Sequence, residues 1–513
     1  MSQPAAVAIE PEIISIGQLA LPPQRRLSIA MLLALAALLH VATCGWGPIE
    51  NGTDGMNAAI ARELADGVTP AGIGQLWDQP VHSTAARWLT AQSFRLFNVS
   101  EMSARLPFGI ANVLIVAMVF LIGERIGGFW RGLASGIIAA TMSGAILHGR
   151  DGGGAALTAL LLTIAFYGAV RMLEQRSRWP WHVLYWSAVS ALFFLGHPAA
   201  AILAIISVWI PLLVFRETRI RLKLPWWLLC NGIFLALLAV HLRHHAMRFP
   251  SVGLMNSGRF FWALFPWSVV VLPPFFLRLR QILRLREMTP AECTLWCLFI
   301  LGSSWTGLFS NAEEWPVNVA CLGPIFALLA SLIWDRTSGR IRMLGVSLLI
   351  ILAISGMGLC GPVAGREWLT LLQPIWWLSS GVIILFGISA LIALHHRHSR
   401  AALLTIAAST IPLAFNLLDA RARYDWQHTL KDLGKKVEVR YTPGARVYMT
   451  GSLDDLSSFL FYAPQGLTIQ KATPNTNISP GEYLLARSES KIPIGLEKLG
   501  SNGGYHLFVA AKR

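Results

Sequence analysis

The chain has 513 residues, of which 54% are hydrophobic and only 13% are charged, and its formal net charge is +15. Soluble domains carry about 25% charged residues, so this composition excludes a soluble globular protein and indicates a polytopic membrane protein. The positive charge does not indicate nucleic-acid binding, because most arginines and lysines fall in short links between apolar runs, as in cytoplasmic loops of membrane proteins.

About thirteen apolar runs are each close to the length that a bilayer requires. The first run follows Arg25 and Arg26 and has no small-residue cleavage site after it, so we expect a retained span and no cleavable signal peptide. The basic links fall in every second loop, which predicts a cytoplasmic N-terminus and, for an odd number of spans, a C-terminus on the outer side. The expected spans are 27–47, 106–123, 132–148, 154–171, 181–196, 199–215, 225–241, 260–277, 291–309, 316–334, 343–361, 372–394 and 401–417.

The long link 48–105 joins the first two spans on the expected outer side. Its segment "MNAAIARELADG" has helical character and ends at Gly67, a suitable C-cap. Most of the link is not hydrophobic enough to cross a bilayer. Two amphipathic helices lying along the membrane surface fit it, with Trp77 and Trp88 as interfacial anchors.

Three aspartates fall at expected membrane edges on the outer side: Asp54, Asp78 and Asp151. Asp54 also has a simpler interpretation as the N-cap of the following helix, and Asp151 has one as a solvated loop residue. Acidic residues are costly near lipid and usually face a cavity, a partner or an ion, so three of them on one side favour a functional site. We expect Asp54 and Asp151 to face one cavity under the link 48–105.

The tail from about residue 420 differs in character from the rest of the chain. The segments "ARVYMTG" and "EYLLARS" are typical of short strands, and "DLSSFLFYAPQG" is typical of a short helix that runs into a turn. The expected organisation is an all-α transmembrane domain over 1–419, followed by a small α/β domain over 420–513 on the outer side.

These segments together resemble the polyprenyl-phosphate-sugar-dependent glycosyltransferases of the membrane-embedded C-type fold, in particular aminoarabinose transferase-like and protein O-mannosyltransferase-like proteins. The resemblance rests on "TDGMNAAIAREL", on "DQPVHSTAARWLTAQSFRLFNVSEMSARLPFG", on Asp151, on Pro266-Trp267-Ser268 and on the tail. The Asp-Glu pair of the family is replaced by Thr53-Asp54 or Asp54-Gly55, and the second proline of the family pattern is Val81.

The resemblance implies a bacterial inner (plasma) membrane enzyme that moves a sugar from a polyprenyl-phosphate carrier to a lipid, glycan or protein acceptor on the outer face. Such transfer needs a carboxylate near the acceptor nucleophile, for which we expect Asp54 with Asp151 as its partner. Guanidinium groups suit the phosphate. The expected substrate-binding residues are Asp78, Gln79, His82, Arg62, Arg87, Arg150, Arg243, Arg248 and Arg259.

No cofactor is implied with certainty. His244 or His245, with Asp78 as an oxygen ligand, is one candidate site for a divalent metal; the alternative is a pair of solvated histidines, since the strong paired spacing of zinc sites is absent. Two other functions stay open: a transporter, and a non-catalytic relative that binds the polyprenyl lipid. Ionisable residues are scarce within the spans, which favours an interfacial enzyme over a transport pathway.

Overall fold

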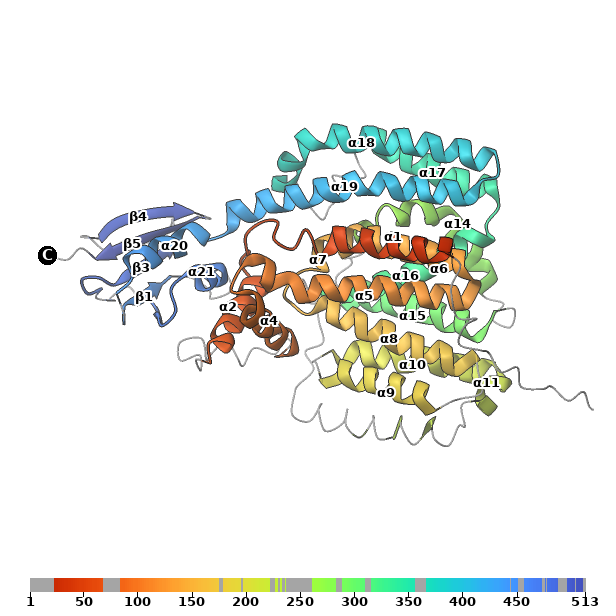
Figure 1. Cartoon of the computed structure of the whole chain (residues 1–513), viewed down its shortest axis with the longest axis horizontal. Helices are drawn as coiled ribbons and strands as arrows, with labels where there is room; N and C mark the ends of the chain where they lie inside the picture. The colour runs from red at the N-terminus through yellow and green to blue at the C-terminus, as the bar shows by residue number, and fades with distance from the viewer. Residues whose placement is uncertain are drawn as a thin grey trace, which may run out of the picture.

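The computed structural model describes a helical bundle with a small sheet domain at one end (Figure 1). The described residues are 23–67, 84–174, 179–194, 197–221, 227–228, 231–232, 236, 261–282, 288–309, 315–355, 366–442, 444–450, 456–472, 476, 478–487, 496–502 and 504–510.

The bundle helices follow the apolar runs of the sequence closely. Five of them contain segments long and apolar enough to cross a membrane, namely α5, α8, α16, α18 and α19. The prediction of an all-α polytopic membrane domain is confirmed, while the count of thirteen spans stays a prediction. The helices are α1 (Pro23–His40), α5 (Glu101–Gly127), α6 (Phe129–Thr141), α7 (Ser143–His148), α8 (Ala155–Glu174), α9 (Trp179–Phe194), α10 (Pro198–Val214), α11 (Arg216–Arg221), α14 (Trp267–Ile282), α15 (Pro290–Phe309), α16 (Trp315–Arg336), α17 (Gly339–Ser355), α18 (Arg366–His395) and α19 (Ser399–His428).

The third expected span is broken into α6 and α7. Met142 between them is extended, and Ser143 turns away from the α6 path to bond with the segment before α14. Its backbone N–H donates to the Phe265 carbonyl at 3.1 Å, and its hydroxyl donates to the Trp262 carbonyl at 2.7 Å. These bonds replace the helical hydrogen bonds that are lost at the break. Helix α7 then ends at His148, directly before the loop 149–154 that contains Asp151.

Two helices of the link 48–105 lie between the bundle and the sheet domain (Figure 1). They are α2 (Thr53–Ala65) and α4 (Thr84–Phe97). The expected helical segment is confirmed, with Asp66 as C-cap and Gly67 following at φ +70°. The indole of Trp88 is 58% exposed, which fits an interfacial anchor, whereas Trp77 lies outside the described residues.

The C-terminal domain is a five-stranded sheet in the order β2-β1-β3-β5-β4, with β1 parallel to β2 and β3 and the other pairs antiparallel. Its core buries Leu433 and Val437 of one helix against Val447, Phe459 and Leu485. The expected strands and short helix are confirmed. Helix α19 is continuous through residues 419 and 420, and the domain boundary there stays a prediction. The elements are α20 (Lys431–Arg440), β1 (Arg446–Met449), α21 (Ser457–Tyr462), β2 (Thr468–Lys471), β3 (Tyr483–Arg487), β4 (Leu496–Asn502) and β5 (Tyr505–Ala510).

Candidate functional site

Asp54 lies in the first turn of α2 and is almost fully buried, at 4% exposure. The N-cap of this helix is Gly52, so Asp54 is not the cap that the simpler interpretation of the sequence proposed. One carboxylate oxygen accepts two bonds from Arg105, at 2.9 and 3.2 Å, and the other accepts the backbone N–H of Gly152 at 2.9 Å. The carboxylate is therefore occupied by protein donors.

Arg105 comes from the second turn of α5 and is 1% exposed. Besides Asp54, its guanidinium donates to the backbone carbonyls of Gly47 at 3.0 Å and Pro48 at 2.9 Å. A buried charge is tolerated only where it is paired and hydrogen-bonded, and Arg105 meets both conditions. It thereby ties the end of the first span to α2 and α5. The sequence analysis did not select Arg105, although an arginine at the entry of a long apolar helix was a usable signal.

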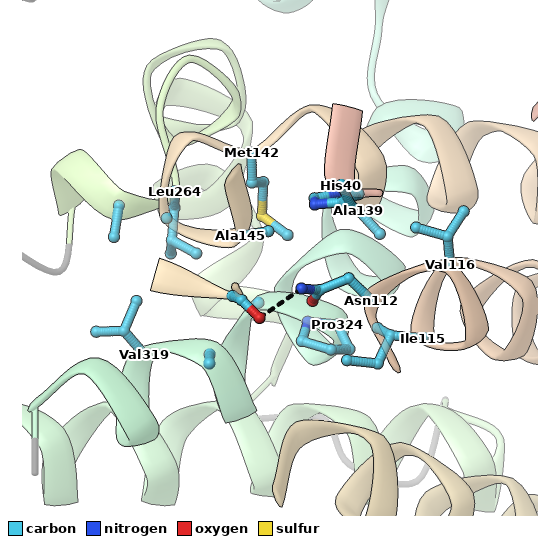
Figure 2. Close-up of a pocket in the computed structure, with 15 residues that line it drawn as sticks. His40, Asn112, Ile115, Val116, Ala139, Met142, Ala145, Leu264, Val319 and Pro324 are labelled. Atoms are coloured by element: carbon cyan, nitrogen blue, oxygen red, sulfur yellow. Dashed lines mark hydrogen bonds between the residues drawn. The ribbon is translucent and has the colours of Figure 1, made fainter. Parts of the chain in front are cut away.

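The loop 149–154 is held by polar side chains from three directions. Asn112 of α5 donates to the Gly149 carbonyl at 2.7 Å, beside a small cavity that His40 also lines (Figure 2). Asn57 of α2 donates to the Gly152 carbonyl at 2.8 Å, and the buried Arg150 donates to the Thr43 carbonyl at 2.8 Å. These bonds fix the backbone on both sides of Asp151.

Arg421, near the end of α19, joins three further carboxylates. It contacts Glu50 closely, Asp425 at 3.0 Å and Asp151 at 3.7 Å. His148 lies on the other side of Asp151, with 3.4 Å between its Nδ1 atom and a carboxylate oxygen. The side chains of Glu50 and Asp151 are 25% and 20% exposed, so these two carboxylates are partly buried, whereas that of Asp54 is 3% exposed.

We call the group Asp54, Arg105, Glu50, Asp151, Arg421 and Asp425 the carboxylate–arginine cluster. It combines residues of the segment before α2, of α2, α5 and α19, and of the loop 149–154. It lies where the bundle meets the sheet domain, since α19 leads into that domain (Figure 1). The sequence predicted Asp54 and Asp151 here, and the structure brings both into one network. The sequence analysis missed Glu50, Arg421 and Asp425.

The two partly buried carboxylates, Glu50 and Asp151, differ in proton affinity. Desolvation raises the pKa of Glu50 to about 8, although Arg421 opposes the rise, and the nearby Asp425 adds to it. Burial also raises the pKa of Asp151, but Arg421 and His148 outweigh it and hold this pKa below its ordinary value. At neutral pH the cluster therefore presents an ionised Asp151 beside Glu50, whose pKa is about 8.

The other predicted arginines in the described part of the chain fall into two groups. Arg87 of α4 is buried and donates to the Asn57 side chain at 3.0 Å, and Arg150 is buried next to Asp151, so both border the cluster. Burial lowers the pKa of Arg87, and it lowers the pKa of Arg150 to about 10. Arg62 instead donates to the Phe461 and Ala463 carbonyls, at 2.6 and 2.8 Å, and joins α2 to the sheet domain.

Eight predicted site residues lie outside the described residues: Asp78, Gln79, His82, Arg243, His244, His245, Arg248 and Arg259. Within the described ranges, no three histidines, cysteines or acids gather in a way that could hold a metal ion. The candidate metal ligands belong to the undescribed segments, so the metal site stays a prediction.

Comparisons with known proteins bear on the class of this site. A family model described as dolichyl-phosphate-mannose-protein mannosyltransferase matches residues 81–244. ArnT from Cupriavidus metallidurans in the apo state is similar in structure, with a TM-score of 0.76 and 14% identity over 94% of this chain and 98% of that one. The same protein bound to undecaprenyl phosphate gives a TM-score of 0.73 and 13% identity, again over 94% and 98%.

A more distant structure is the archaeal oligosaccharyltransferase AglB from Archaeoglobus fulgidus, in complex with an inhibitory peptide and a dolichol-phosphate. It gives a TM-score of 0.50 and 8% identity over 91% of this chain and 70% of that one. No curated protein matches the chain in sequence. The fold is that of ArnT, from the transmembrane bundle through the C-terminal sheet. The resemblance to C-type membrane glycosyltransferases that the sequence indicated is thereby confirmed.

Proposed function

We propose that this chain is an integral membrane glycosyltransferase that moves a sugar from a polyprenyl-phosphate carrier to a lipid, glycan or protein acceptor. The observation that carries the proposal is the carboxylate–arginine cluster, assembled where an apolar bundle of the ArnT fold meets its sheet domain. Two of the similar structures hold polyprenyl phosphates, undecaprenyl phosphate and dolichol-phosphate, which supports this class of donor.

The reaction needs a carboxylate that reaches the acceptor. The acceptor nucleophile attacks the anomeric carbon, its proton passes to the carboxylate, and the bond between the sugar and the phosphate breaks. The sequence favoured Asp54 for this base. Its carboxylate is bound by Arg105 and by the Gly152 N–H, so we propose that Asp54 positions the loop 149–154 and that Asp151 receives the proton.

Asp151 suits the part of the base for two reasons. Its side chain is 20% exposed against 3% for Asp54, so it is the more accessible of the two carboxylates to an acceptor. Its backbone is fixed by the bonds to Gly149 and Gly152, which hold the carboxylate in place against the substrate. Glu50 beside it, with a pKa near 8, is a second group that exchanges protons at neutral pH.

The leaving phosphate requires positive charge. We propose Arg87 and Arg150, which border the cluster, and keep Arg243, Arg248 and Arg259 as further candidates. Asp78, Gln79 and His82 are proposed to contact the substrate, with a divalent metal at His244 and His245 as an option. We also propose an inner-membrane location with the N-terminus cytoplasmic and the sheet domain periplasmic, because the described basic residues Arg25, Arg131, Arg342 and Arg400 gather at the opposite end of the bundle.

The proposal is tested with full-length protein in proteoliposomes. A panel of undecaprenyl-phosphate-linked sugars, radiolabelled in the sugar, is incubated with an envelope extract as acceptor, and transfer of the label is measured. The proposal predicts transfer from at least one donor, together with release of undecaprenyl phosphate. Binding of undecaprenyl phosphate without transfer from any donor indicates the non-catalytic lipid-binding relative, and movement of intact donor across the bilayer indicates a transporter.

A further inference from the structure

A second charged site lies at the opposite end of the bundle from the sheet domain. Here a cavity of about 430 Å³ opens among the ends of α1, α5, α6, α16, α17 and α19. We call it the arginine cavity. Its charged and aromatic lining residues are Arg25, Arg131, Arg342, Arg400, Asp335, Phe129, Trp130 and Trp334.

The charge of the arginine cavity is unbalanced. Four arginines line it and Asp335 is the single acid among its lining residues. Asp335 is paired with Arg131 at 3.1 Å. In the described part of the chain, neither Arg25 nor Arg400 is ion-paired with a carboxylate, so the cavity keeps a net positive charge that attracts anions.

Aromatic rings hold three of these guanidinium groups in place. Arg25 lies 5.2 Å from the centre of the Phe129 ring, Arg400 lies 4.6 Å from that of Trp130, and Arg342 lies 5.5 Å from that of Trp334. A ring that stacks on a guanidinium face orients the group and leaves its N–H edge available to an anion.

The backbone adds two further anion-binding features. Helices α6 and α19 both begin at the cavity, and their N-caps, Gly128 and His398, make no side-chain cap bond. Free N–H groups at a helix N-terminus favour negative charge. The guanidinium of Arg131 packs directly against the backbone of Gly127, where a Cβ atom would clash with it.

We propose that the arginine cavity binds the phosphate headgroup of an anionic phospholipid from the leaflet at this end of the bundle. Basic pockets between transmembrane helices are suited to such headgroups. The cavity also borders the lipid-facing side of the bundle, because its lining residue Leu404 is 43% exposed and lies on an apolar span. A lipid therefore finds charge for its phosphate and an apolar path for its acyl chains, whereas a free phosphate uses only the first.

The test measures lipid binding to full-length protein in detergent by native mass spectrometry. Phosphatidylglycerol is compared with phosphatidylcholine of the same acyl chains. The test variant is Arg25→Gln with Arg400→Gln. The matched control is Arg26→Gln with Arg340→Gln, which removes two exposed arginines from the same end of the bundle that do not line the cavity.

Each basic residue near an anionic headgroup contributes about fivefold to binding, so the test variant is expected to bind phosphatidylglycerol about 30-fold more weakly than wild type. The control variant is expected to bind it as wild type does, and phosphatidylcholine is expected to bind all forms weakly. Equal losses in the two variants would overturn the proposal, because they would indicate attraction by the basic surface in general. Displacement of the lipid by excess inorganic phosphate would also overturn it, in favour of a soluble phosphate ligand.

Discussion

Asp54→Asn is the substitution that tests the buried ion pair between Asp54 and Arg105 most directly. The variant keeps the shape of the side chain and removes the charge that Arg105 faces at 2.9 Å. Both side chains are 3% exposed or less, so the guanidinium is left buried without the one carboxylate that it contacts, although Asp425 and Asp151 lie near enough to attract it. Removing one partner of such a pair costs about 3–5 kcal/mol of unfolding free energy, and we expect the lower value because Arg105 keeps two backbone carbonyls.

The assay is equilibrium unfolding in mixed SDS micelles, with Asp419→Asn as the matched control. Asp419 is paired with Arg423 at 2.8 Å, but these side chains are 40% and 51% exposed, and such surface pairs contribute roughly 0.2–1 kcal/mol. The double variant Asp54→Asn with Arg105→Gln is expected to lose less than the sum of the two single losses, because the unpaired charge is gone. Equal stability of the Asp54→Asn and Asp419→Asn proteins would refute the buried-pair interpretation.

Three further predictions concern the loop 149–154, the Glu50 carboxyl group and the orientation of the chain in the membrane. Gly152→Ala is expected to cost about 1–3 kcal/mol of unfolding free energy, because the new Cβ would lie 2.9 Å from the Oδ1 atom of Asp54, whose carboxylate Arg105 holds through the other oxygen; an unchanged SDS midpoint would contradict this close packing. The Glu50 pKa is raised from 4.5 to about 8 in the fold, so its contribution to stability is complete below pH 4.5 and is lost as pH rises through 8. Stability should accordingly fall between about pH 5 and pH 8 in wild type, level off above pH 8, and fall less in Glu50→Gln; identical pH profiles would contradict this assignment. Alkaline phosphatase fused after Arg513 is expected to be active, because that enzyme folds only outside the cytoplasm, and an inactive fusion with normal expression would reverse the proposed orientation.

Much of the bundle could be predicted because a span is a local property of the sequence. A run of about 20 apolar residues is sufficient to indicate a transmembrane helix, and helices such as α8, α15 and α16 begin and end within a few residues of the expected limits. The last expected span, 401–417, ends where Asp419 and Arg421 lower the hydropathy, whereas helix α19 itself runs from Ser399 to His428. The helix continues to His428, since its polar end packs against other polar groups at the cluster.

The site was harder to predict because its contacts join residues far apart in the chain. Glu50 and Arg421 are 371 positions apart, and no local pattern links them. Asp54 and Asp151 could be selected because an isolated acid at a membrane edge is costly. The role of Asp54 could not be inferred in the same way. The sequence does not fix where the helix begins to within two residues, so it could not show that Gly52 is the N-cap and that Asp54, two positions later, forms a buried ion pair instead.

The most direct measurement is sugar transfer by Asp151→Asn in proteoliposomes, beside wild type and Asp54→Asn. The donor is whichever labelled undecaprenyl-phosphate sugar wild type accepts, and kcat and KM are measured separately. If Asp151 receives the acceptor proton, Asp151→Asn lowers kcat about a hundredfold or more with little change in KM or in the SDS unfolding midpoint. Transfer by Asp151→Asn at the wild-type rate would contradict the proposed site, and a steep loss in Asp54→Asn without loss of stability would return the base to Asp54.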